Sequence, residues 1–301
     1  MRRLKLLLNG IQLKPMGGTR NMEKFEQLEK LGHTRFEGLI PHSTMQLFEE
    51  TIIELYGLQA SKIGDFRSQA LETLKGNGSN FEKFCKLYEL LEKDDKDALY
   101  QVQKFLPASK GARNMFSDDV MDLCAQALGS DRRRLLIDGP AVFINRPNTE
   151  RLLYRWHSEV HYYPKRRRFL NVWLPLFTSK TKNNGTMSFK EQSHKNSYPF
   201  VEYQGYSAKS EKKNSFIQFE IPPNFLTDLE EYWVEANVGD LVVFDKNLAH
   251  TSNANTSDQY SAAIVARVWD PSEDLTLSGN VDATPYGGNL GRQNLVVSSE
   301  Q

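Results

Sequence analysis

The segments YRWHSEVHYYP, residues 154–164, and FLNVWLPLF, residues 169–177, lie close together in the second half of the chain. Both are rich in aromatic and other apolar residues, so we expect strands over Leu152 to Tyr163 and Phe169 to Phe177. Short strands that follow one another, separated by turn residues, favour an antiparallel sandwich or barrel. Similar runs on either side of these segments predict further strands over 134–145, 215–221, 232–237, 241–244 and 261–269.

The first half of the chain differs, because its apolar residues recur at the three- and four-residue spacing of amphipathic helices. Helices followed by strands predict an α+β chain in which the helices pack on an all-β core. We expect a single domain over residues 22–301 with a helical insert at about 65–130, preceded by a flexible basic segment at residues 1–21. The expected helices cover 22–31, 43–56, 80–91, 95–105 and 117–128.

Composition excludes several classes of protein. Lys plus Arg and Asp plus Glu both number 38, whereas a general nucleic-acid binder is expected to carry a basic excess. No apolar run approaches the roughly 18 residues of a membrane span. The two cysteines, Cys85 and Cys124, are too few for a disulfide framework, and we expect reduced thiols in a cytoplasmic protein. The basic, acid-poor residues 1–20 leave an organelle-targeting segment open. The expected partner is a small-molecule substrate; the sequence gives no oligomeric state.

A metal site is the chemistry that the segment around His157 suggests. On a strand, residues two apart point to the same face about 6.7 Å apart, so His157 and Glu159 can reach one ion. On a helix the two side chains would diverge by roughly 200°. His161 would lie about 13 Å from His157 on a regular strand. This is too far to share an ion, so the third ligand is expected from elsewhere.

His250 is the best candidate for that third ligand. It follows a turn and a strand, GDLVVFD at residues 239–245, and precedes a polar loop. Two histidines and one carboxylate leave three coordination positions open, which is the arrangement of non-haem iron(II) oxygenases. Zinc binds similar ligands but usually keeps one open position. Ordinary packing roles for these three side chains stay open from spacing alone.

Four segments in order resemble the phytanoyl-CoA dioxygenase family. The first two are Leu28 to Ile40, similar to the family's opening strand, and Trp156 to Pro164, similar to its Trp-His-x-Asp signature. Asn184-Gly-Thr-Met187 with Ser193-His-Lys195 resembles the Asn-Gly…Gly-Ser-His segment. Gly239-Asp240 through His250-Thr-Ser252 to Asn255 resembles the segment of the distal histidine. The resemblance runs from about residue 28 to residue 270.

This resemblance implies a double-stranded β-helix, a jelly-roll barrel with N-terminal and flanking helices. It implies iron(II), 2-oxoglutarate and oxygen, with hydroxylation of a small organic substrate and release of succinate and carbon dioxide. His157, Glu159 and His250 would be the metal ligands. Glu159 stands where the family usually has Asp, and related 2-oxoglutarate oxygenases also use Glu there.

A second departure concerns the arginine that the family places eleven residues after the distal histidine, where it grips the far carboxylate of 2-oxoglutarate. Ser261 occupies that position here. Arg267 lies six residues further on the same strand face and has the planar fork that binds a carboxylate bidentately. We therefore expect Arg267 to anchor 2-oxoglutarate and Ser261 to add a hydroxyl contact; an ion pair of Arg267 with a strand neighbour or with Asp270 stays open. The basic run 165–168 competes as an anchor, but such runs are more often solvated.

Asn171 lies on the strand expected at 169–177 and is a candidate contact of the co-substrate, with a hydrogen-bonded core position as the alternative. His161 and His194 are expected to be structural. The sequence thus predicts a 2-oxoglutarate-dependent iron dioxygenase. The serine at position 261 keeps a second function open, a non-catalytic metal- or ligand-binding protein of the same fold.

Overall fold

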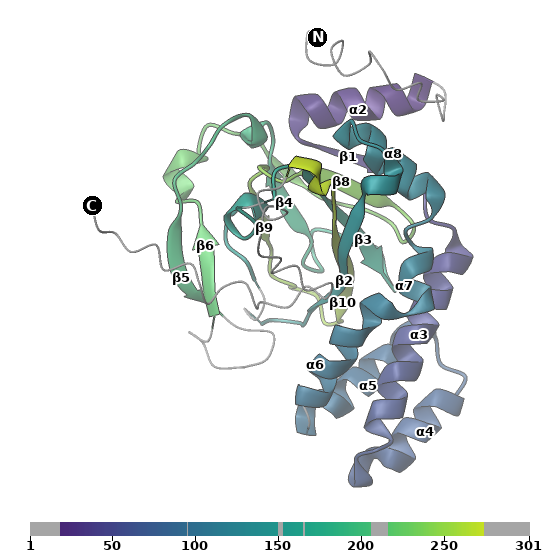
Figure 1. Ribbon diagram of the computed structural model, residues 1–301. Coiled ribbons are helices and arrows are strands. Elements are labelled where there is room, and N and C mark those ends of the chain that lie inside the picture. Colours follow the sequence, from purple (N-terminus) through teal and green to yellow (C-terminus); the bar gives the residue numbers. More distant parts are fainter. Residues whose placement is uncertain (1–18, 95, 150–152, 165, 206–215, 274–301) are drawn as a thin grey trace.

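The computed structural model describes residues 19–94, 96–149, 153–164, 166–205 and 216–273 (Figure 1). The chain is an α+β protein whose sheets are antiparallel, as predicted. A five-stranded sheet has the order β1 (His33–Phe36), β8 (Leu241–Asp245), β3 (Phe169–Leu176), β10 (Ser261–Trp269) and β2 (Leu136–Asn145). A three-stranded sheet has the order β7 (Glu231–Trp233), β4 (Met187–Lys190) and β9 (His250–Ser252), and β5 (Val201–Gly205) pairs with β6 (Phe216–Glu220).

The predicted helices are present within a few residues of their expected ends, with two short additions, α4 (Arg67–Lys75) and α7 (Lys110–Asn114). Local signals explain both ends of α8 (Asp118–Leu128): the Ser117 hydroxyl accepts from the backbone N–H of Val120 at its start, and Gly129 ends the helix in the left-handed conformation. No helix in the described ranges is long and apolar enough to cross a membrane. The helices are α2 (Thr19–Leu31), α3 (His42–Ala60), α4 (Arg67–Lys75), α5 (Asn80–Asp94), α6 (Lys96–Phe105), α7 (Lys110–Asn114) and α8 (Asp118–Leu128).

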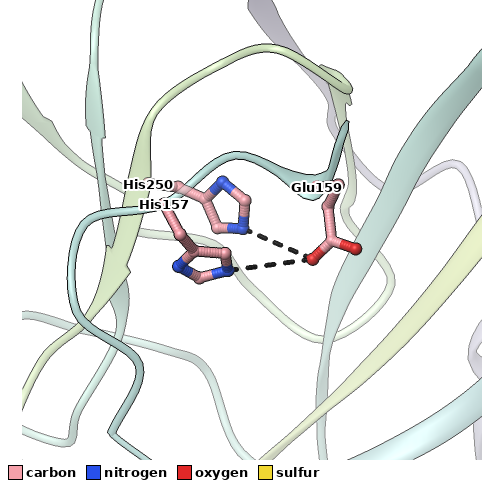
Figure 2. A group of neighbouring side chains, drawn as sticks. All are labelled: His157, Glu159 and His250. Atoms are coloured by element: carbon pink, nitrogen blue, oxygen red, sulfur yellow. Dashed lines mark ion pairs between the residues drawn. The ribbon is translucent and has the colours of Figure 1, made fainter. Parts of the chain in front are cut away.

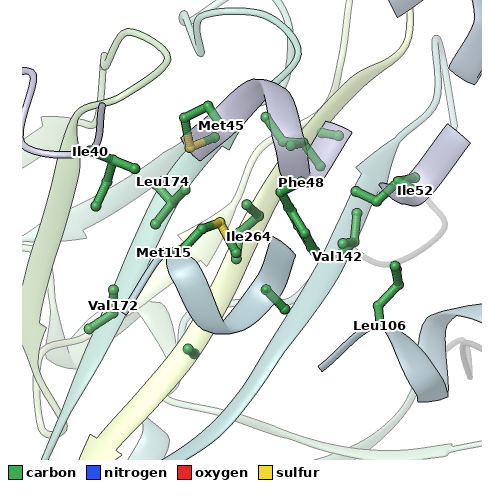
Figure 3. Close-up of a cluster of buried hydrophobic side chains, with 14 of the residues drawn as sticks. Ile40, Met45, Phe48, Ile52, Leu106, Met115, Val142, Val172, Leu174 and Ile264 are labelled. Carbon is green, nitrogen blue, oxygen red and sulfur yellow. The ribbon is translucent and has the colours of Figure 1, made fainter. Parts of the chain in front are cut away.

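The larger hydrophobic core joins the helices to one face of the five-stranded sheet (Figure 3). Phe48 and Ile52 of α3 meet Val172 and Leu174 of β3 and Ile264 of β10 in this cluster. Every residue of β3 is buried, which indicates that both faces of this central strand are covered.

The opposite face of the five-stranded sheet meets the three-stranded sheet. Trp173, Phe244 and Ala263 from the large sheet form a second apolar cluster with Phe189 of β4. Side chains alternate along a strand, so Ser261, Ala263, Val265 and Arg267 of β10 share this face, as do Asn171 and Trp173 of β3. We call this the inter-sheet face.

The strand expected over Leu152 to Tyr163 is wrong. In the described part of that segment, His157 forms an isolated antiparallel bridge with His250, and a 3-10 turn spans Glu159–His161. The strand expected at 232–237 ends early at Trp233, and the short strands β4, β5 and β9 were not predicted. Gly139-Pro140 lies inside β2, near the point where pairing with β10 shifts register between Val265 and Arg267. Residues 1–18 of the segment expected to be flexible lie outside the described residues.

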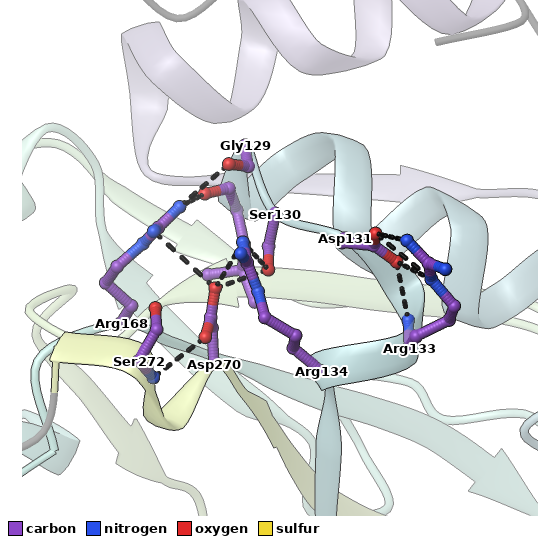
Figure 4. Close-up of polar contacts among 9 residues, drawn as sticks. Gly129, Ser130, Asp131, Arg133, Arg134, Arg168, Asp270 and Ser272 are labelled. Atoms are coloured by element: carbon purple, nitrogen blue, oxygen red, sulfur yellow. Dashed lines mark hydrogen bonds and ion pairs between the residues drawn. The ribbon is translucent and has the colours of Figure 1, made fainter. Parts of the chain in front are cut away.

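The end of β10 is tied to α8 by a buried carboxylate (Figure 4). Asp270 accepts from the Ser130 hydroxyl, pairs with Arg134 (Nη2 to Oδ2, 3.3 Å) and lies 3.5 Å from Arg168 Nη1. Arg168 also donates to the last carbonyls of α8, 3.0 Å to that of Gly129. The prediction of a solvated basic run is therefore wrong for Arg168, because its charge is used at a helix C-terminus and a buried acid.

Replacing Asp270 with asparagine is expected to lower the free energy of unfolding by about 1–3 kcal/mol at pH 7. Burial raises the pKa of Asp270, but hydrogen bonds from Ser130 and Ser272 and the charge of Arg134 outweigh it and bring the pKa to about 2. The pKa of this carboxyl group is lower in the folded state than in the unfolded chain, where it is near 4. The ionised carboxylate therefore stabilises the fold at pH values above about 4, and this contribution disappears as the pH falls toward 2. Urea unfolding should show that the free energy of unfolding falls more between pH 7 and pH 3 for the parent than for Asp270→Asn. Equal decreases for the two proteins would contradict this role of Asp270.

Candidate metal centre

Two of the three candidate ligands come from one short segment. Ser158, between them, has φ −121° and ψ 150°, which is extended backbone. One extended residue is sufficient to bring the side chains of His157 and Glu159 to the same side, although the turn begins at Glu159. The geometric argument from strand spacing therefore holds for this pair even though the strand itself is absent.

His250, the third candidate, is the first residue of β9 and lies beside His157. Their backbones exchange two N–H···O hydrogen bonds, each of 2.9 Å, and their rings are 4.1 Å apart between centroids. This bridge between residues 93 positions apart in the numbering brings the two imidazoles together.

The three side chains converge as Figure 2 shows. Glu159 Oε1 lies 3.8 Å from His157 Nε2 and 3.7 Å from His250 Nε2, and one ligand atom from each residue lies within 4.8 Å of the others. The Nδ1 atoms donate to backbone carbonyls, of Arg155 at 2.7 Å and of Leu248 at 2.9 Å. With Nδ1 protonated, each Nε2 presents a lone pair toward the shared space, which is how metal-bound histidines are usually oriented.

Arg267 holds the other oxygen of the carboxylate. Its Nε and Nη2 lie 3.0 and 2.9 Å from Glu159 Oε2, which leaves Oε1 facing the histidines. Burial raises the pKa of Glu159, but the charge of Arg267 and the neighbouring imidazoles of His157 and His250 hold it well below its usual range. Burial, followed by the charge of His157, lowers the pKa of His250. An ionised carboxylate and a neutral imidazole are the forms that bind a metal ion.

Asn171 faces Arg267 across the β3–β10 pair. Its side chain is 0% exposed, yet neither its amide nitrogen nor its amide oxygen has a hydrogen-bond partner among the described residues. An unpaired buried amide costs about 1–3 kcal/mol per group, and both polar atoms of Asn171 are open to a further hydrogen-bond partner. The alternative of a hydrogen-bonded core asparagine is not what the structure contains.

The remaining predicted residues lie apart from the three ligands. The Ser261 hydroxyl accepts from Lys180 Nζ at 2.7 Å and donates to the carbonyl of Asn184. His161 packs on Phe200, with ring centroids 4.2 Å apart, and His194 Nε2 is 3.1 Å from the Glu29 carbonyl. Neither histidine joins the ligand group, as expected.

Arg166, in the basic run that competes for the anchor role, is also engaged. Its Nη1 lies 2.7 Å from Asp138 Oδ2, and its guanidinium stacks over Tyr163 and Trp269. Sequence reasoning missed one residue of interest, Lys180. No local signal marks it, because its surroundings are created by pairing between distant strands.

Aromatic rings line the side of the ligand group next to His157. Tyr154 and Tyr162 lie 5.5 and 5.4 Å from the His157 ring between centroids, and Phe219 of β6 lies 4.9 Å from Tyr162. The Tyr162 hydroxyl accepts from the backbone N–H of Phe219, which fixes this wall to the β5–β6 hairpin.

Comparison with solved structures finds similar folds at low sequence identity. EctD from S. alaskensis in its apo form has a TM-score of 0.53 and 13% identity, with coverage of 87% of this chain and 80% of that one. The non-heme monooxygenase ThoJ, also apo, has a TM-score of 0.50 and 18% identity, with coverage of 82% and 77%. EvdO2 from Micromonospora carbonacea var. aurantiaca has a TM-score of 0.50 and 14% identity, with coverage of 86% and 94%.

No curated protein matches the sequence significantly. The sequence profile of the phytanoyl-CoA dioxygenase (PhyH) family matches residues 32–263, which is more than half of the chain. Iron(II), 2-oxoglutarate and oxygen are the cofactor and co-substrates of this family, and two imidazoles with one carboxylate are the ligand set that such iron sites use. The chain therefore belongs to the phytanoyl-CoA dioxygenase family.

Proposed function

We propose that the protein is an iron(II)- and 2-oxoglutarate-dependent dioxygenase that hydroxylates a small organic substrate. In the balanced reaction, one oxygen atom enters the substrate C–H bond, and the other enters succinate as 2-oxoglutarate loses carbon dioxide. The observation that carries the proposal is the convergence of His157, Glu159 and His250 within 4.8 Å. The bound iron would supply the oxygen activation, and three ligands on one side leave room for a bidentate 2-oxo acid and oxygen.

The residues around the ligands fit this role. Carbonyl-bound Nδ1 atoms fix the orientation of both imidazoles, and Arg267 fixes the carboxylate. We assign Arg267 this positioning role because its guanidinium is already paired with Glu159. Asn171, beside Arg267 and without a hydrogen-bond partner among the described residues, would then hydrogen-bond 2-oxoglutarate near the metal.

We also propose that the two main sheets form a double-stranded β-helix within a single domain. The inter-sheet face would be the interior of this jelly roll, and the helices between residues 65 and 130 would be an addition to its outer face. The substrate would enter beside the aromatic wall of Tyr154, Tyr162 and Phe219.

Anaerobic titration followed by oxygen exposure tests the function. The protein with iron(II) should develop a visible charge-transfer band when 2-oxoglutarate is added, and oxygen should then give succinate in amounts that depend on both. Glu159→Ala should give neither the band nor succinate. If the protein binds iron(II) but neither binds nor consumes 2-oxoglutarate, the proposal is wrong and the non-catalytic metal-binding function replaces it.

A further inference from the structure

Lys180 is a buried amine that meets no acidic side chain among the described residues. Its side chain is 1% exposed, and Nζ donates to Ser261 Oγ at 2.7 Å, Asn145 Oδ1 at 2.9 Å and the Gly185 carbonyl at 3.3 Å. All three acceptors are neutral, and Lys180 has no ion pair in the described part of the chain. Burial lowers its pKa to about 7. Lysines are almost never fully buried unless paired, so this one indicates an anion that is yet to bind.

The ammonium lies at the inter-sheet face, at the opposite end of β10 from Arg267. Its partner Ser261 is the first residue of β10 and shares a face with Ala263, Val265 and Arg267. The backbone of Lys180 is held by two hydrogen bonds with Ala236. Ala236 belongs to the apolar cluster between the two sheets. The side chain therefore bridges from one wall of this space to the other.

A dicarboxylate that chelates a metal through its 2-oxo acid end carries a second carboxylate at its far end. That charge needs a cation in a buried site. The guanidinium of Arg267 already pairs with the Glu159 carboxylate and lies over the ring of Tyr163. Lys180 is then the cation on this face, among the described residues, whose charge no acid balances.

The separation suits a ligand that extends away from the metal. Phe189 pairs with His250, and Gly185 lies four residues earlier on the same segment, or about 13 Å along an extended chain. A chelated five-carbon diacid spans part of this distance. The flexible four-carbon stem of lysine allows the ammonium to move toward it. Ala263, between the two ends on β10, presents only a methyl group to the path.

We propose that Lys180 binds the far carboxylate of 2-oxoglutarate and replaces the arginine that the family carries where this chain has Ser261. The inference rests on the proposed function. It changes the assignment made from sequence for Arg267, which then positions the metal ligand Glu159 and leaves the far carboxylate to Lys180.

Binding of two acids to the iron(II)-loaded protein under nitrogen tests the proposal. Pyruvate has the same chelating end as 2-oxoglutarate but no far carboxylate. Lys180→Met and Lys180→Gln should lower the affinity for 2-oxoglutarate about 10- to 100-fold, which corresponds to the loss of a charged hydrogen bond. The affinities for pyruvate and for iron(II) should not change. Lys180→Arg should retain most of the 2-oxoglutarate affinity. Lys182→Met, an exposed lysine two residues away, is the matched control and should bind both acids as the parent does.

Three results would overturn the inference. Lys180→Met and Lys180→Gln could bind 2-oxoglutarate as tightly as the parent does. They could also lose affinity for pyruvate by the same factor as for 2-oxoglutarate. Arg267→Gln could lose 2-oxoglutarate while keeping pyruvate and iron(II), which would make Arg267 the anchor. These three results would leave the proposed function standing. A parent that does not bind 2-oxoglutarate would overturn the proposed function, and this inference with it.

Discussion

His250→Ala is expected to lower the affinity for iron(II) by more than about 100-fold. Loss of a group that only supports a metal ligand typically costs 10- to 100-fold, and removal of a ligand itself should cost more. The remaining pair, His157 and Glu159, would hold the ion through two groups. Isothermal titration with iron(II) under nitrogen measures the change directly. Titration with manganese(II) provides an independent check, because this ion is much less readily oxidised than iron(II), so a lower affinity cannot be attributed to oxidation of the metal.

The control for this experiment is His42→Ala, which removes an exposed imidazole at the start of α3. It should leave the iron(II) affinity unchanged. Circular dichroism should show the same fold for both variants, since His250 lies at the beginning of a short strand. If His250→Ala binds iron(II) as tightly as the parent, the three converging side chains do not form the metal centre.

Phe48→Ala is expected to lower the free energy of unfolding by about 3–5 kcal/mol, the usual cost of truncating a buried phenylalanine. Phe48 is 0% exposed and lies in the core that joins α3 to β3 and β10. The cavity would open on the face of the sheet that points away from the ligands. The folded fraction of this variant should therefore bind iron(II) normally.

Leu47→Ala, one position earlier, provides the comparison because Leu47 is 39% exposed. Urea unfolding should show a much smaller change for it than for Phe48→Ala. Similar losses for the two variants would mean that α3 does not use the face that the structure assigns to the core. An iron(II) affinity that falls with Phe48→Ala in the folded state would connect the helical layer to the site.

The residues of the candidate site could be named from sequence because they stand in a local pattern. The spacing of His157 and Glu159 needs a single extended residue between them, and Ser158 provides it. His250 could be inferred from its place after a turn and a strand. Sequence could not show that the chain turns at Glu159, because that turn depends on contacts with the β5–β6 hairpin and with Lys246.

The same contrast applies to the basic residues. The alternation along β10 placed Arg267 on the inner face, and β10 spans the predicted residues 261–269. Alternation does not reveal which acid lies opposite, so the pairing of Arg267 with Glu159 was not predicted. Arg168 was expected to be solvated, yet it closes a buried cluster at Asp270 to which three separate segments contribute, residues 129–134, Arg168 and residues 270–272.

The amino-acid sequence was sufficient to predict helices followed by antiparallel strands, the family and the three candidate ligands. These depend on periodicity and short spacings, which act over a few residues. The charge pairs became visible only in the folded protein: Arg267 pairs with Glu159, Asp270 pairs with two arginines, and Lys180 meets no acid among the described residues. The reason is physical, since the energy of a buried charge depends on neighbours that strand pairing brings from distant parts of the chain.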